Sequence, residues 1–146
     1  MCRQIPVPGV TMTSRQELEF HLRQVVEMVP TALFMLDDSH AVTYWNLACE
    51  RLTRIGAERM IGSRDPWRAF HERPRPLLAN VVIDGVSDSV MRALFGEGVR
   101  ASVDAAGGWE TVSYSEILKR PLLIAAAPLL DLDGRVVGAL QTAREA

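Results

Sequence analysis

The side chains in this sequence that are able to do chemistry are scattered rather than clustered. His21, His40 and His71 have no second histidine, cysteine or acid at the spacing that a metal site needs, so we expect none. Cys49 lies in an apolar helical pattern with no histidine nearby, and the sequence holds no nucleophile-elbow pattern. Asp37 follows an apolar run, where turn capping is its expected role. The sequence therefore predicts a protein that is not an enzyme.

Length and composition fit one globular domain. The chain has 146 residues, of which 48% are hydrophobic and 23% charged. With a net charge of −2 and arginines interrupted by acids, binding to nucleic acid is not expected. Two distant cysteines favour reduced thiols. The longest apolar run, residues 121–130, is too short to span a membrane, and no signal peptide is found. We therefore expect a cytoplasmic protein without a membrane segment.

The N-terminal part predicts a flexible leader at residues 1–13 and an amphipathic helix at residues 14–29. Ser14 and Glu17 form an S-x-x-E capping box, and Pro30 ends the helix. A stripe of apolar residues recurs on one helix face at spacings of four, three and four: Leu18, Leu22, Val25 and Val29. Such a stripe either packs against the protein's own sheet or joins two parallel helices in a homodimer, and we favour the dimer.

The remaining chain reads as short strands and short helices. Two strands around a polar turn, residues 32–37 and 41–45, predict a hairpin. Asn46 is expected to cap a helix that runs through Thr53. Further short helices are expected at residues 57–61, 65–70 and 75–83 and after Ser87. A mobile loop at residues 96–108 then leads to three strands, at residues 109–117, 122–130 and 136–142.

Segregated hairpins with helices between them predict an α+β domain, in which an antiparallel sheet carries helices on one face. The last two strands meet at the turn Asp133-Gly134. Pro128 lies inside the second of the three final strands, where it predicts an edge position or a bulge.

This order of elements resembles that of the PAS domain family, in particular bacterial sensory PAS domains of sensor kinases and chemoreceptors. The similar segments are VPTALFMLDDSHAVTYWN (29–46), ACERLTRIGAERMIG (48–62), RDPWRAFHERPRPLLANVVIDG (64–85) and AAAPLLDLDGRVVGALQT (125–142). The resemblance implies a PAS sensor domain at residues 30–146, with a five-stranded sheet of order 2-1-5-4-3. Arg54 departs from the pattern, because the family most often has glycine at the end of that helix.

The resemblance also implies an internal ligand pocket. Trp45 and Cys49 stand at positions that face the cavity in PAS domains, and Thr53 follows one helical turn later. Strand alternation places Phe34 and Leu36 on the same inward face. The candidate ligand-binding residues are Phe34, Leu36, Trp45, Cys49, Thr53, Trp67, Phe70, Leu78 and Val82. The alternative is that these side chains simply pack an ordinary core, and for each single residue we favour that alternative.

The sequence does not identify a cofactor, but haem and covalently bound flavin are not expected. Haem-binding PAS domains use a histidine on the helix before the third strand, and residues 75–83 contain none. Covalent flavin attachment needs an Asn-Cys-Arg-Phe motif, which this sequence lacks.

Two functions from different classes follow. The first is a sensor that binds a small molecule internally and relays the signal through dimer contacts to an effector, as in two-component systems. The second is a ligand-free dimerisation or protein-interaction module, in which Trp45, Trp67 and Phe70 fill the pocket. The volume of the cavity distinguishes the two. An enzyme would require a converging acid–base pair in the same place.

Overall fold

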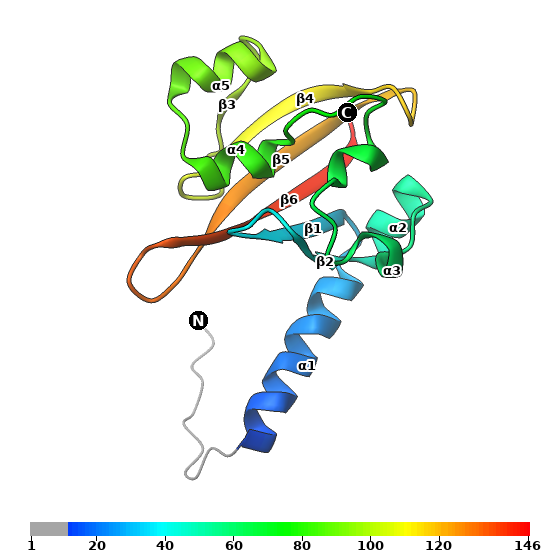
Figure 1. The fold of residues 1–146 in the computed structure, drawn as a ribbon, viewed down its shortest axis with the longest axis vertical. Coiled ribbons are helices and arrows are strands. Elements are labelled where there is room, and N and C mark those ends of the chain that lie inside the picture. The colour runs from blue at the N-terminus through cyan, green and yellow to red at the C-terminus, as the bar shows by residue number, and fades with distance from the viewer. Residues whose placement is uncertain (1–11) are drawn as a thin grey trace.

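A computed structural model describes residues 12–146 as an antiparallel sheet with helices on one face (Figure 1). Residues 1–11, which make up most of the predicted leader, lie outside the described part. The helices are α1 (Met12–Met28), α2 (Leu47–Thr53), α3 (Ala57–Met60), the 3-10 helix η1 (Pro66–Ala69), α4 (Leu78–Asp84) and α5 (Asp88–Phe95). The strands are β1 (Ala32–Asp37), β2 (Val42–Trp45), β3 (Arg100–Ala101), β4 (Trp109–Ser115), β5 (Arg120–Leu130) and β6 (Val136–Glu145).

The sheet has the order β2-β1-β6-β5-β4-β3, and every neighbouring pair is antiparallel. Its first five strands reproduce the predicted order, so the α+β fold is confirmed. The sixth strand, β3, has two residues and lies inside the segment 96–108 that the sequence predicted to be a loop. The segment has few bulky side chains and four glycines, which is typical of a loop. A strand of two residues is also too short to show the alternation by which strands are predicted.

The first hairpin forms as predicted because polar side chains close its turn. The carboxylate of Asp37 accepts hydrogen bonds from the backbone N–H groups of Ser39 and Ala41, at 2.9 and 3.0 Å, and from the Ser39 hydroxyl at 2.6 Å. The hydrogen bond from that hydroxyl is the main reason that the pKa of Asp37 is lowered. At the tip, His40 takes a positive φ of 70°. Asp37 therefore caps a turn, as expected.

Close contact between β1 and β6 holds the first hairpin to the final one. A Cβ atom at Gly138 would lie 2.2 Å from the carbonyl oxygen of Leu36, so only glycine fits where the two strands approach. The turn between β5 and β6 contains Gly134 at φ 81°, which matches the predicted Asp133-Gly134 turn.

Asn46 connects three elements through one fully buried side chain. Its Oδ1 accepts hydrogen bonds from the backbone N–H of Leu33 on β1, at 3.0 Å, and of Cys49 on α2, at 2.9 Å. Its Nδ2 donates to the carbonyls of Val26 and Thr31, both at 3.0 Å, and of Val29 at 3.3 Å. Asn46 therefore caps the start of α2, as predicted, and also the end of α1, where the last carbonyls lack helical partners.

Several predicted helix boundaries are wrong in instructive ways. Met12 and Thr13 are already helical, so Ser14 lies inside α1 and is not its N-cap residue. The helix predicted at residues 75–83 begins only at Leu78, because Pro74 and Pro76 hold the residues before them in extended conformations. The predicted helix at residues 65–70 is a 3-10 helix, and Asp65 makes no side-chain capping bond.

The structure explains how Arg54 replaces the usual glycine and how Pro128 fits inside a strand. Arg54 takes the left-handed conformation that glycine would favour, at φ 64°, and its N–H donates to the carbonyl of Glu50 at 2.7 Å. The helix is therefore capped without glycine. Pro128 lies in the central strand β5, but the pairing of β5 with β4 ends at Ala126. Pro128 thus occupies a local edge, where its missing N–H leaves no gap.

Removing the Asn46 side chain tests this connection. Asn46→Ala should lower the free energy of unfolding by about 3 kcal/mol, because several buried backbone groups lose their partner. Asn46→Ser keeps an acceptor for the N–H of Cys49 and should cost about 1 kcal/mol less. Urea denaturation measures both. Thr43→Ala, which removes one exposed hydrogen bond, is the control, and equal stability of Asn46→Ala and Thr43→Ala would contradict this account.

Candidate functional site

Three aromatic rings meet between the sheet and the short helices. The ring centroids of Phe34 and Trp45 lie 5.4 Å apart, and Phe70 lies 6.2 and 6.3 Å from them. These distances are those of direct aromatic packing. All three side chains are buried, so they fill the space into which a pocket was predicted to open.

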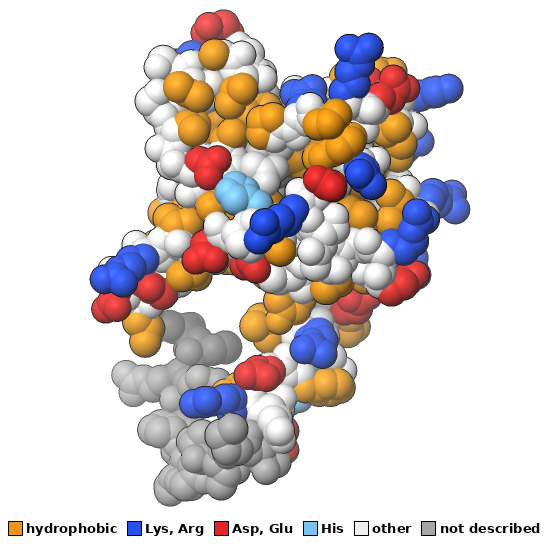
Figure 2. Space-filling model, viewed as in Figure 1, with side chains coloured by type: hydrophobic (Ala, Val, Ile, Leu, Met, Phe, Trp, Pro, Cys, Tyr) orange, Lys and Arg blue, Asp and Glu red, His pale blue; other side chains and the backbone are white. Residues whose placement is uncertain are grey.

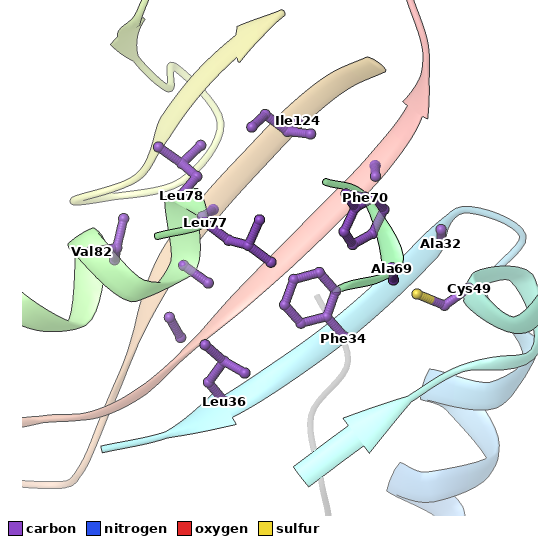
Figure 3. Packing of buried hydrophobic residues seen from close by; sticks show 14 of the residues in the cluster. Ala32, Phe34, Leu36, Cys49, Ala69, Phe70, Leu77, Leu78, Val82 and Ile124 are labelled. Carbon is purple, nitrogen blue, oxygen red and sulfur yellow. The ribbon is translucent and has the colours of Figure 1, made fainter. Parts of the chain in front are cut away.

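Most of the predicted pocket residues converge on this cluster (Figure 3). Phe34 and Leu36 point inward from β1, as strand alternation predicted, and Leu78 and Val82 face the sheet from α4. Trp67 is only half-buried and packs at the margin of the core, where the guanidinium of Arg68 lies 5.5 Å from its ring. Trp67 therefore lies beside the aromatic cluster rather than at its centre.

The polar groups expected to orient a ligand are used by the protein itself. The indole Nε1 of Trp45 donates to the carbonyl of Ile55 at 3.0 Å. The hydroxyl of Thr53 donates to the carbonyl of Cys49 at 2.8 Å and accepts from the N–H of Ile55 at 3.3 Å. A ligand at this position would have to compete with these bonds.

Cys49 is fully buried, and its thiol is free. Burial, aided by the nearby carboxylate of Glu50, raises the pKa of the thiol far above its ordinary value. The thiolate is the nucleophilic form of cysteine, so this side chain acts as a small apolar group of the core.

A small cavity of about 10 Å³ remains beside the aromatic cluster. That volume accommodates one water molecule at most. Its lining includes polar residues that are not among the predicted ligand-binding residues: His71, Ser113, Ser115 and Gln141. Gln141 accepts a hydrogen bond from the N–H of Ala79 at 2.9 Å and so joins α4 to β6. Period-two alternation between Ala139 and Ala143 placed Gln141 on the inward face, and that signal could have found it.

The side chain of His71 is buried. Its Nδ1 lies 2.6 Å from the carboxylate of Glu116. This hydrogen bond is the main cause that lowers the pKa of Glu116, and Arg75 adds a smaller favourable charge. The neighbouring Ser115 hydroxyl donates to the carbonyl of Phe70 at 2.6 Å. Together these contacts tie the end of η1 to the turn between β4 and β5.

The other two histidines lie apart from this cluster. His40 contacts Asp84 at 3.1 Å and Asn80 at 2.9 Å, which links the first hairpin to α4. His21 is exposed on α1. Within residues 12–146 no three histidine, cysteine or acidic side chains gather as metal ligands would. No helix in the same range has the length and apolar character needed to cross a membrane.

Comparison with known proteins identifies the architecture. The PAS family model, described as the PAS fold, matches residues 21–81. The PAS domain of an HTR-like protein from Haloarcula marismortui aligns with a TM-score of 0.55 at 13% identity, covering 92% of this chain and 97% of that chain. The PAS domain of BvgS from Bordetella pertussis aligns with a TM-score of 0.53 at 14% identity, covering 89% of this chain and 85% of that chain. A PAS domain from Colwellia psychrerythraea aligns with a TM-score of 0.52 at 16% identity, covering 88% of this chain and 97% of that chain. No curated protein matches the sequence.

Titration of Glu116 gives a pH-dependent prediction. Because its folded-state pKa lies below the ordinary value of 4.5, the carboxylate stabilises the fold fully above about pH 5.5. That contribution should fade as the pH falls through 4.5 towards the folded-state pKa. The difference in urea midpoint between the wild type and Glu116→Gln should therefore shrink from pH 6 to pH 3. Glu97→Gln, at an exposed carboxylate, serves as the control; the same pH profile for both variants would refute the His71–Glu116 interaction.

Proposed function

We propose that this chain, which contains a PAS domain, is a sensory signalling module that relays its signal through protein contacts of α1. The supporting observation is the combination of a filled interior with an exposed apolar helix that is hydrogen-bonded to the core. We also propose a cytoplasmic location, an effector domain or protein as the recipient of the signal, and no catalytic step. The predicted division into a leader, a dimerisation helix and a sensor domain at residues 30–146 belongs to the same proposal.

The N-terminal helix leaves the body of the domain, as Figures 1 and 2 show. Among its residues 14–28, only Val26 is buried, and it lies at the end that meets α2. The predicted stripe is exposed, with Leu18 at 55%, Leu22 at 54% and Val25 at 61%, whereas Val29 is half-buried. Apolar side chains at this exposure support burial against another surface.

A second copy of the chain is the partner that we propose for this stripe. An apolar groove of about 600 Å³ runs along the last turns of α1, between His21 and Pro30. Parallel pairing of two such helices would bury the stripe in the manner of a short coiled coil. A shift of one helix against the other would then act on the Asn46 hydrogen bonds, and through them on β1 and α2.

Acidic substitutions in the stripe test the dimer. Leu22→Asp combined with Val25→Asp should convert a dimer into a monomer, because buried carboxylates without partners oppose association. Gln16→Asp combined with Arg23→Gln changes the net charge equally on the opposite helix face and should leave the dimer intact. Light scattering with size-exclusion chromatography reads both. An unchanged oligomer in the Leu22/Val25 variant would exclude this contact.

Small-molecule sensing is the second candidate, supported by the polar lining of the small cavity. Gln141, Ser113 and His71 offer polar groups next to the aromatic cluster. If Phe70 moved aside, the rings of Phe34 and Trp45 that now pack against it would line the vacated volume, and we propose the predicted ligand-binding residues as the site that would then form. Sensing would then require a conformational opening, and the free energy of that opening would reduce the apparent affinity.

Native mass spectrometry of freshly purified protein separates the two candidates. A filled interior predicts that each protomer has the mass of its polypeptide alone. Phe70→Ala, which removes a ring from the centre of the cluster, should create a cavity and bind an added apolar probe such as indole. A small molecule bound to the wild type in one-to-one ratio would favour sensing and contradict the filled interior.

A further inference from the structure

The outer edge of β4 is largely open. The strand β3 pairs only with Trp109 and Glu110, the first two residues of β4. In the described part of the chain, residues 111–115 have no strand on that side. An open edge of this length offers backbone hydrogen bonds to any extended chain that approaches it.

The hydrogen-bond alternation identifies the backbone groups that point outward. Ser102 donates from its N–H to the carbonyl of Gly108 at 2.9 Å, so even-numbered residues of β4 face β3. On the other side, Ala146 donates to the carbonyl of Pro121, so β5 turns its odd-numbered residues towards β6. The even-numbered residues of β5 therefore pair with the odd-numbered residues of β4. This agrees with the pairing of the even-numbered residues of β4 with β3. The N–H and C=O groups of Val112 and Tyr114 consequently point to the open edge.

A groove of about 300 Å³ lies along this edge. Val112, Ser113 and Tyr114 form its strand side, and Leu94 and Phe95 of α5 form the opposite side. Leu94 is 42% exposed and Tyr114 is 56% exposed, so apolar surface is available on both sides. The groove therefore combines outward-facing backbone groups with apolar side chains, which are the two requirements for binding a strand. The Val112 carbonyl accepts only a long hydrogen bond of 3.5 Å, from the Thr111 hydroxyl, which an added strand could replace.

Arg75 and Glu116 supply the charges in the groove. The Glu116 carboxylate is already hydrogen-bonded to His71. Arg75 is half-buried and makes no hydrogen bond or ion pair with another residue of the described chain, although it is near enough to lower the pKa of Glu116. Both side chains line the groove, but Arg75 is the group that can still form an ion pair with a ligand, and the natural partner of its guanidinium is a carboxylate.

We propose that the open edge of β4 binds an extended acidic segment of a partner protein as an added strand. The backbone of this segment would pair with Val112 and Tyr114. Its residue opposite Ser113 faces the helical side of the sheet, where a glutamate side chain would meet Arg75 and apolar neighbours would meet Leu94 and Phe95. This contact is separate from the stripe on α1, so it holds or fails independently of the proposed dimer.

A blocked synthetic peptide, Thr-Val-Thr-Glu-Thr-Val-Thr, is a suitable probe. When it binds at millimolar concentration, hydrogen exchange at the amides of Val112 and Tyr114, measured by NMR, should slow. The amides of Thr111 and Ser113, which face β5, should not change. The control is the same peptide with N-methyl groups on the alternate residues whose N–H groups would pair with Val112 and Tyr114. This peptide has no backbone donors for the edge and should not bind.

Charge pairing is tested by a double-mutant cycle. Replacing the central glutamate of the peptide with glutamine should weaken binding about threefold or more, and Arg75→Gln should weaken it equally. Combining the two changes should cost no more than either alone. Arg92→Gln, at an exposed arginine of α5, is the matched control and should leave the affinity unchanged.

Three results would overturn the proposal. The first is the absence of any slowed exchange with the peptide. The second is equal binding of the N-methylated peptide. The third is protection of Val112 and Tyr114 in the free protein that grows with protein concentration, because a second copy would then occupy the edge.

Discussion

The buried side chain of Asn46 holds α1, β1 and α2 in one arrangement. It satisfies backbone groups at the end of α1, the start of β1 and the start of α2, and it does so without contact with solvent. Because unpaired groups in such a place are costly, the three elements are held in one arrangement. The orientation of the exposed helix is therefore coupled to the core through hydrogen bonds rather than through a large packed interface. A coupling of this kind either holds or breaks, which suits a two-state relay.

Because side chains fill the interior, the structure favours a signal that comes from protein contacts over one that comes from an internal ligand. Phe34, Trp45 and Phe70 occupy the centre, and the indole and hydroxyl groups that could have oriented a ligand bond to the backbone. Open surfaces of the described chain include the apolar stripe of α1 and the edge of β4. Both are suited to protein partners. The molecule thus offers more to bind outside its core than inside it, and this difference favours a module that works by contact.

Much of this arrangement was predictable from the sequence. The first hairpin, the capping role of Asn46 and the strand order follow from turn residues, alternation and the PAS resemblance. The additional bonds of Asn46 to α1 were not predictable, since they depend on how the end of α1 packs beside α2. Burial of His71 was missed because its partner Glu116 lies 45 residues away. Arg54 shows that a family's glycine can be replaced when the backbone bond to Glu50 compensates for the conformation.

A distance measurement within one protomer can show whether Asn46 fixes α1 to the core. Spin labels at Arg15→Cys on α1 and Thr43→Cys on β2, with Cys2→Ser, report the helix orientation by double electron–electron resonance. Cys49 should escape labelling because its thiol is buried and its pKa is raised. Labelled protein diluted with unlabelled protein restricts the signal to pairs inside one chain. If Asn46 fixes the helix, the distance distribution should be narrow in the wild type and should broaden in Asn46→Ser. An equally narrow distribution in that variant would show that these hydrogen bonds do not fix α1.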